Sequence, residues 1–294
     1  MQQLETIAFV TSLVSLQVAL VLYIWGFVST ALGRQPSDRN ASRFAVPVLV
    51  LAWLALTLSL MAHAIQTGRI PATDMFEFSM SFGWGILTVV LVFRWRQKND
   101  MVIAAGALVA LAMLIYAFTL PARHEPLSAA LNQTWLLPLH VSCAIIAYGL
   151  FALGFVCGVL YIAGRRWIAP LMPSAETLDR LGYRSALAGF CFMTAVIVIG
   201  SIWAKIAWGT YWSWDPKETA ALMTWLIYGC YIVTRLALGW RDSRSAWFLV
   251  AGFIAVLVTY FGNYFFGGLH SYATSDPSLL PAVGLLLFPA RLLE

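Results

Sequence analysis

The chain has 294 residues, of which 61% are hydrophobic and only 11% are charged, and its mean hydropathy is +0.80. A soluble domain carries about 25% charged residues, so this composition excludes an ordinary soluble protein. The apolar runs do not alternate with polar residues at a period of two, which excludes a transmembrane barrel. The net charge of +5 would suit a nucleic-acid partner, but its uneven distribution between loops explains it without one.

Apolar runs of about 20 residues recur along the whole chain, and each is long enough to cross a hydrocarbon core of about 30 Å as a helix. We therefore predict an all-α polytopic membrane protein that forms a single integral membrane domain over residues 1–294. The eight expected transmembrane helices are 7–33, 44–67, 76–94, 101–120, 139–163, 185–204, 218–239 and 246–266.

Lysine and arginine are divided unevenly between the two sets of connections. One set contains 13 of the 18: Arg34, Arg39, Arg43, Arg94, Arg96, Lys98, Arg165, Arg166, Arg180, Arg184, Arg235, Arg241 and Arg244. The other set contains Arg69, Arg123, Lys205, Lys217 and Arg291. The positive-inside rule assigns the first set to the cytoplasm. Both termini and the segment 203–218, which we therefore call external, are then extracytoplasmic.

The segment between the sixth and seventh spans reads WGTYWSWDPKE, residues 208–218. Its end predicts the start of a helix, with Asp215 as N-cap and Pro216 at the first helical position. Glu218 then occupies the position from which a carboxylate reaches back to the cap, which completes a capping box.

The same segment is unusually rich in tryptophan, with Trp203, Trp208, Trp212 and Trp214 within twelve residues. Tryptophan collects at membrane–water interfaces, where one or two rings per helix end are typical. A cluster of four also suits a platform for a planar apolar ligand, at about 0.5–1.5 kcal/mol per aromatic contact beyond area burial. The tryptophans alone leave both interpretations open.

Four histidines are present, and in this topology none lies in a cytoplasmic loop: His63, His124, His140 and His270. Each by itself fits a hydrogen-bonded interface histidine. As a set, His140 at the start of span five and His270 just after span eight could approach each other above the tryptophans. Two neutral imidazoles across a flat ring describe bis-histidine haem ligation. Zinc is the rival, but no HxxxH or HExxH spacing supplies further ligands.

The four cysteines all fall within expected spans and form no CxxC pair: Cys143, Cys157, Cys191 and Cys230. We expect them to be small buried hydrophobic residues rather than a redox pair.

The stretch WGTYWSWDPKETAALMTW (208–225) resembles the WWD signature of the CcsA/ResC-type proteins of cytochrome c biogenesis. It is less similar to the shorter haem-handling protein of the other assembly pathway, which lacks the PKET continuation. The stretches GRIPATDMFEFSMSFGW (68–84), LPLHVSCAIIAYGLFALGF (137–155) and GNYFFGGLHSY (262–272) also resemble that family, so the similarity covers most of the chain.

The resemblance implies a protein that binds haem b at the extracytoplasmic face and presents it for thioether attachment to the CxxCH motif of apocytochrome c. It implies His140 and His270 as the axial ligands of the iron. The haem-binding segment would comprise Trp208, Tyr211, Trp212, Trp214, Asp215 and Lys217. Implied partners are a ResB/CcsB-type membrane subunit, apocytochrome c and an extracytoplasmic thiol reductant system, with the lipid bilayer as surroundings and no nucleic acid.

The chain departs from the family pattern at one place. A further histidine is expected near the cytoplasmic end of the helix after the WWD segment, where this sequence has Ile232 and Val233. Two alternatives stay open. One is a stable haem-b electron-transfer subunit, which the missing histidine slightly favours. The other is a transporter of another hydrophobic anion, which the tryptophan platform with paired histidines disfavours. Whether the chain is an enzyme, as part of a cytochrome c synthetase complex, is left undecided.

Overall fold

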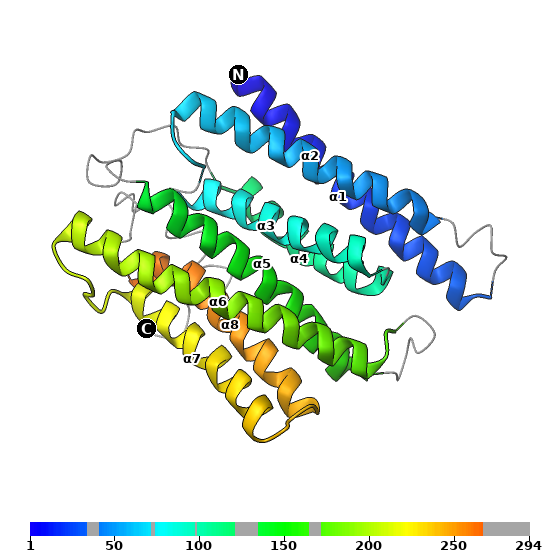
Figure 1. Cartoon of the computed structure of the whole chain (residues 1–294). Coiled ribbons are helices and arrows are strands. Elements are labelled where there is room, and N and C mark those ends of the chain that lie inside the picture. Colours follow the sequence, from blue (N-terminus) through cyan, green and yellow to red (C-terminus); the bar gives the residue numbers. More distant parts are fainter. Residues whose placement is uncertain (34–40, 72–73, 98, 121–134, 165–171, 267–294) are drawn as a thin grey trace, which may run out of the picture.

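The computed structural model describes residues 1–33, 41–71, 74–97, 99–120, 135–164 and 172–266, and these residues contain eight α-helices and no strand (Figure 1). The helices are α1 Gln2–Ala31, α2 Ala41–Thr67, α3 Met75–Arg96, α4 Asp100–Phe118, α5 Leu136–Ala163, α6 Ala175–Trp208, α7 Pro216–Ala237 and α8 Ser243–Phe266. Each contains a segment long and apolar enough to cross a membrane. The expected all-α polytopic fold is thus confirmed, while the orientation in the membrane stays a prediction.

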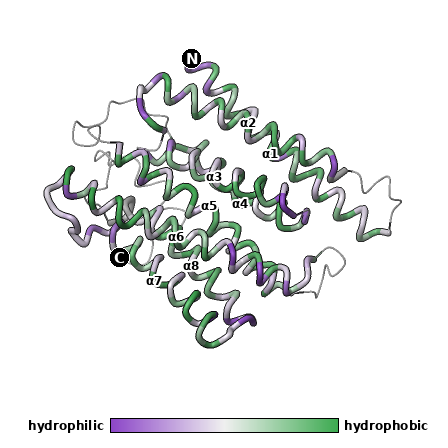
Figure 2. Tube along the Cα trace, viewed as in Figure 1, coloured by the Kyte–Doolittle hydropathy of each residue, from purple (hydrophilic) through white to green (hydrophobic). Residues whose placement is uncertain are grey.

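Consecutive helices pack as four pairs, α1 with α2, α3 with α4, α5 with α6, and α7 with α8. Helix α5 lies in the middle and also contacts α3, α4 and α8 (Figure 1). Figure 2 shows hydrophobic residues along most of each helix and hydrophilic residues gathered toward the helix ends. This is the distribution that a lipid environment around the middle of the bundle requires.

Small residues allow the central helices to approach closely. A Cβ atom added to Gly149 of α5 would lie 2.8 Å from the carbonyl oxygen of Gly85 in α3. A Cβ added to Gly85 would lie 2.9 Å from the backbone oxygen of Ile145. Backbone-to-backbone packing of this kind replaces the hydrophobic driving force that is missing between helices in lipid.

Two sequence-based expectations differ from the structure. Helix α6 begins ten residues before the expected span 185–204, because its first turns carry charged residues that lower the local hydropathy. Ser174 caps this start by accepting a hydrogen bond from the backbone N–H of Thr177. Among the cysteines, Cys143 and Cys157 are buried as expected, but Cys191 and Cys230 are exposed on α6 and α7, so the expectation of burial was wrong for that pair.

The two ends of the bundle differ in character. We call one the tryptophan end, where α2 and α6 finish and α1, α3, α5 and α7 begin. In Figure 1 the N-terminus, at the top, and the α6–α7 connection, at the left, both lie toward this end. We call the opposite end, where α3 finishes and α6 begins, the arginine end.

Candidate functional site

The connection between α6 and α7 ends in the capping box expected from the sequence. The Asp215 carboxylate accepts a hydrogen bond from the backbone N–H of Lys217 at 2.9 Å. The Glu218 carboxylate reaches back and accepts from the backbone N–H of Asp215 at 3.3 Å and of Ser213 at 2.8 Å. These bonds satisfy donors that the start of α7 would otherwise leave unpaired, and they fix the path of the preceding tryptophans.

Trp214 is the single non-glycine residue with a positive φ among the described residues, at 58°. A left-handed conformation costs an L-residue roughly 1–2 kcal/mol, and for a bulky residue it is a real outlier. The turn directs the indole outward, where it is 69% exposed, and its ring meets Trp212 edge to face at 5.8 Å. The capping box of Asp215 and Glu218 beside Trp214 offsets this backbone strain and thereby holds the indole in its exposed position.

A pocket opens at the tryptophan end between α5, α6 and α7. We call it the aromatic pocket, and its lining includes Phe78, His140, Trp203, Tyr211, Trp212 and Lys217. Thr259 of α8 also lines it, which brings the last turns of α8 to the same place. Aromatic walls with a few polar groups are typical of a ligand-binding site.

His140 lies in the first turns of α5 and points across to α6. Its Nδ1 lies 2.9 Å from the carbonyl oxygen of Val196. A carbonyl only accepts, so Nδ1 carries the proton and the lone pair of the neutral ring is on Nε2. The ring stacks on Trp203 with centroids 6.5 Å apart and planes at 20°. Gly200 makes room for it, because a Cβ there would lie 2.7 Å from the His140 Cε1.

The tryptophans do not form one flat floor. Trp203 is 2% exposed and packs with Leu137 and Val141 in a small core. Trp208 meets it edge to face at 4.7 Å and supports it from outside the pocket. Trp212 lines the pocket, whereas Trp214 does not. The cluster thus supplies a wall behind His140 and a second wall from the α6–α7 connection.

Of the site residues predicted from the sequence, the structure brings His140, Tyr211, Trp212 and Lys217 together around the aromatic pocket. Trp208, Trp214 and Asp215 flank it and do not line it. His270 lies outside the described residues, as does His124.

Two lysines contribute positive charge near this site. The Lys217 ammonium lies 5.5 Å from the centroid of the Phe78 ring inside the pocket, a cation–π arrangement. Lys205 instead donates to the carbonyl oxygen of Gly209 at 2.7 Å, where it caps the end of α6. Lys217 is therefore the cation best placed to meet an anionic group of a bound ligand.

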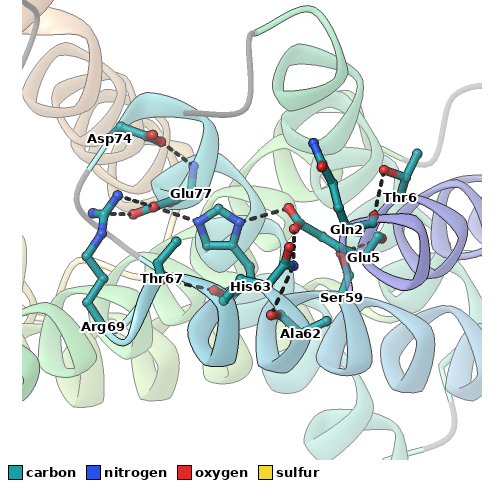
Figure 3. Close-up of polar contacts among 11 residues, drawn as sticks. Gln2, Glu5, Thr6, Ser59, Ala62, His63, Thr67, Arg69, Asp74 and Glu77 are labelled. Carbon is teal, nitrogen blue, oxygen red and sulfur yellow. Dashed lines mark hydrogen bonds and ion pairs between the residues drawn. The ribbon is translucent and has the colours of Figure 1, made fainter. Parts of the chain in front are cut away.

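A buried polar network that the sequence did not predict lies beside the pocket, between α1, α2 and α3 (Figure 3). His63 is 1% exposed, and its Nδ1 lies 2.8 Å from a Glu5 oxygen while its Nε2 lies 2.7 Å from a Glu77 oxygen. The Arg69 guanidinium binds the same Glu77 carboxylate at 2.9 Å. The Gln66 amide donates to the other Glu5 oxygen at 2.7 Å.

The geometry of this network fits a balanced set of charges. With Glu5 and Glu77 both ionised, each carboxylate accepts a hydrogen bond from one ring nitrogen, and His63 is then an imidazolium. With Arg69 and His63 positive and Glu5 and Glu77 negative, the four charges balance. Ionisable residues within transmembrane segments are rare and mark functional or tightly specified places. That rarity is the sequence signal that could have pointed to Glu5, His63 and Glu77 together.

The network is joined to the aromatic pocket through its neighbours in the chain. Phe78, which lines the pocket, directly follows Glu77. Ile70, which packs against the core around Trp203, directly follows Arg69. The Arg69–Glu77 ion pair thus holds Arg69 beside the first turn of α3, while Phe78 lines the pocket and Ile70 packs against the core around Trp203.

Asp74, just before α3, caps that helix by accepting from the backbone N–H of Glu77 at 2.8 Å. Burial, followed by the negative charge of Glu77, raises the pKa of Asp74 to about 6. The carboxyl group therefore takes up a proton in mildly acidic solution.

Residues 71–270, which include the aromatic pocket, match the family described as cytochrome C assembly protein. The chain is 31% identical to the cytochrome c biogenesis protein CcsA of Guillardia theta, over 91% of this chain and 95% of that protein. The chain belongs to the CcsA-type cytochrome c assembly family. The CcsA of Prochlorococcus marinus (strain NATL2A) is 32% identical, over 87% of this chain and 90% of that protein. The role of the chain accordingly lies in cytochrome c biogenesis.

A solved structure shares the fold. The cytochrome c haem lyase CcmF superposes with a TM-score of 0.64 at 18% identity and covers 96% of this CcsA-type chain. The match spans 49% of the CcmF chain, so this chain has about half of its length.

Proposed function

We propose that this CcsA-type chain binds haem at the aromatic pocket and presents it for thioether attachment to the CxxCH motif of apocytochrome c. The observation that carries the proposal is the orientation of His140. Its Nδ1–H donates to the Val196 carbonyl, which places the lone pair of the neutral ring on Nε2, the nitrogen that would ligate iron. Histidines that ligate a metal commonly donate their other ring N–H to a carbonyl in this way.

The second axial ligand in this proposal is His270. It follows the last residue of α8 by four positions, so the chain can bring it within about 14 Å of that helix end. Thr259 places the adjoining part of α8 at the pocket. Haem carries two propionates, and Lys217 would meet one of them, while Tyr211 and Trp212 would contact the ring.

Bis-histidine ligation would protect the iron until the histidine of the CxxCH motif replaces one ligand. The two cysteine thiols would then add across the vinyl groups, so they must be reduced, which calls for an extracytoplasmic thiol reductant system. A ResB/CcsB-type subunit is the proposed membrane partner. If the chain takes part in this thioether attachment, it would belong to a cytochrome c synthetase complex. That complex would act at the extracytoplasmic face of the cytoplasmic membrane or at the equivalent face of the thylakoid membrane.

The test is the absorption spectrum of the purified full-length protein. His140→Ala and His270→Ala should each lose the low-spin haem spectrum, and added imidazole should partly restore it by replacing the missing ligand. His124→Ala is the matched histidine control and should keep the spectrum. A double variant with a normal spectrum would show that these histidines are not the ligands.

A second measurement separates this function from that of a stable haem-b electron-transfer subunit. Mixing the haem-loaded protein with reduced apocytochrome c and the partner subunit should move haem to the apocytochrome. Haem that stays bound and cycles between oxidation states under those conditions would favour the electron-transfer role instead.

A further inference from the structure

A second cavity, of about 230 Å³, lies at the arginine end of the bundle. Helices α3 and α6 form its walls and α5 its floor. The apolar lining includes Val92, Phe93, Leu150, Leu153 and Leu181. Three guanidinium groups lie around it, from Arg96 at the end of α3 and from Arg180 and Arg184 near the start of α6. We call this cavity the arginine groove.

The three arginines concentrate positive charge without a matching acid. Within the described part of the chain, no ion pair joins Arg96, Arg180 or Arg184 to a carboxylate. The acids nearest in the sequence are Asp179 and Glu176. Both oxygens of Asp179 bind Arg235 at 2.6 Å, and Glu176, four residues before Arg180, is exposed and forms no ion pair with it among the described residues. Like charges four residues apart on a helix, as in Arg180 and Arg184, repel each other. An anion in the groove would relieve this repulsion.

The groove also lies at the depth of lipid headgroups. Helix α6 has 34 residues and so a length of about 51 Å, well beyond a hydrocarbon core of about 30 Å. Its first turns, which carry Arg180 and Arg184, therefore project beyond the hydrocarbon. The apolar residues of the groove, including Leu153 and Phe93, continue from this level toward the interior of the bundle. The site thus combines a cationic mouth with an apolar interior.

We propose that the arginine groove binds one anionic phospholipid, with its phosphate on the arginines and an acyl chain along α5. Arginine binds phosphate in a bidentate manner, and the apolar walls of the groove would exclude water from the acyl chain of the lipid. The charge distribution assigns this end to the cytoplasm, where the leaflet is anionic and basic pockets between transmembrane helices take up such headgroups. A free phosphate ion would leave the apolar walls without a partner.

The proposal is independent of haem binding, because the two cavities lie at opposite ends of the bundle. Its failure would leave the proposed haem ligands untouched.

The test uses the full-length protein in phosphatidylcholine nanodiscs to which phosphatidylglycerol is added. Native mass spectrometry of the released protein counts retained lipids, and thermal unfolding reports stabilisation. We expect one phosphatidylglycerol to be retained in preference to phosphatidylcholine, with a higher melting temperature. In Arg180→Gln/Arg184→Gln, retention should weaken about tenfold or more. The matched control, Arg241→Gln/Arg244→Gln, removes the same charge at the same end outside the groove and should retain lipid normally.

A third variant separates loss of the site from loss of the fold. Val92→Trp keeps every arginine and fills the groove from an exposed wall position, so it should fold and still lose the retained lipid. Equal retention of the two lipids by the wild type would overturn the proposal, as would normal retention in Val92→Trp. Displacement of phosphatidylglycerol by equimolar haem, with haem then held in the groove, would also overturn it, because the occupant would not be a phospholipid.

Discussion

Replacing His63 by leucine should destabilise the protein more than a typical single substitution. The change removes the positive ring between Glu5 and Glu77, together with hydrogen bonds of 2.8 and 2.7 Å. Hydrogen bonds to charged groups contribute about 1.5–3 kcal/mol each, and removing one partner of a buried ion pair costs about 3–5 kcal/mol. Glu77 keeps Arg69 and Glu5 keeps Gln66, but both carboxylates lose the positive ring between them. We therefore expect a loss of about 3–5 kcal/mol.

The same reasoning predicts that a second substitution restores stability. In Glu5→Leu/His63→Leu the unbalanced carboxylate is gone, and Glu77 remains paired with Arg69. Replacing a buried ion pair by apolar side chains is often close to neutral. The loss in the free energy of unfolding of the double variant should thus be smaller than the sum of the two single losses by at least about 1.5 kcal/mol. Thr67→Val, which removes only a hydroxyl bond to the His63 carbonyl, is the local control and should cost at most about 1 kcal/mol.

The assay follows from the positions of the cysteines. In a background with Cys191→Ser and Cys230→Ser, the two remaining thiols, Cys143 and Cys157, are buried and react only after unfolding. Equilibrium unfolding in mixed detergent micelles, read from thiol labelling, gives the free energies. Strict additivity of the single variants, or a loss in His63→Leu no larger than in Thr67→Val, would refute the charge assignment of the network.

Three further predictions address the topology, the pocket and Asp74. With the native cysteines replaced, Ser213→Cys should react with an impermeant maleimide from outside intact cells and Ser243→Cys should not; the reverse pattern would invert the assigned orientation. Gly200→Ala places a methyl group 2.7 Å from the pocket histidine and should weaken haem binding, whereas Gly229→Ala, whose Cβ makes only a 3.5 Å contact, should leave the haem spectrum unchanged. The pKa of Asp74 is raised to about 6 from an unfolded value near 4, so this group contributes stability that is fully present below about pH 4. The contribution is lost as the pH rises through about 6. Asp74→Asn should abolish this pH dependence of the free energy of unfolding, measured from about pH 4 to 8.

The fold and the helix start at Asp215 could be predicted because each depends on local sequence. A run of apolar residues predicts a span without reference to any other helix, and a capping box is complete within four residues. The same method placed the start of α6 ten residues too late, because the first turns of that helix are charged and do not form part of an apolar run.

The candidate site was predicted less completely because it depends on contacts between helices. The sequence indicated His140, Tyr211, Trp212 and Lys217, yet it gave no reason to expect that Val196 would orient the histidine. Glu77 lies in the first turn of α3, which Asp74 caps, and a local pattern can indicate a helix start of this kind. Its ion pair with Arg69 and its bond to His63 depend on the packing of α1 and α2 against α3, which local patterns do not contain.

The position of His63 bears on how many haems the chain binds. Ile232 and Val233 replace the histidine that the family resemblance implies near the arginine end of α7, and an apolar side chain cannot ligate iron. His63 cannot take its place, because both of its ring nitrogens bind carboxylates and it lies at the tryptophan end.

The remaining histidine among the described residues is His140, which belongs to the aromatic pocket. We therefore expect one haem per chain, lost entirely in His140→Ala/His270→Ala. The pyridine haemochrome assay on the purified chain measures this ratio. A value near two that falls only to one in the double variant would mean that a second iron site exists away from the pocket. That second site would exist although Ile232 and Val233 cannot ligate iron, and its ligand would be a residue outside the described ones, such as His124.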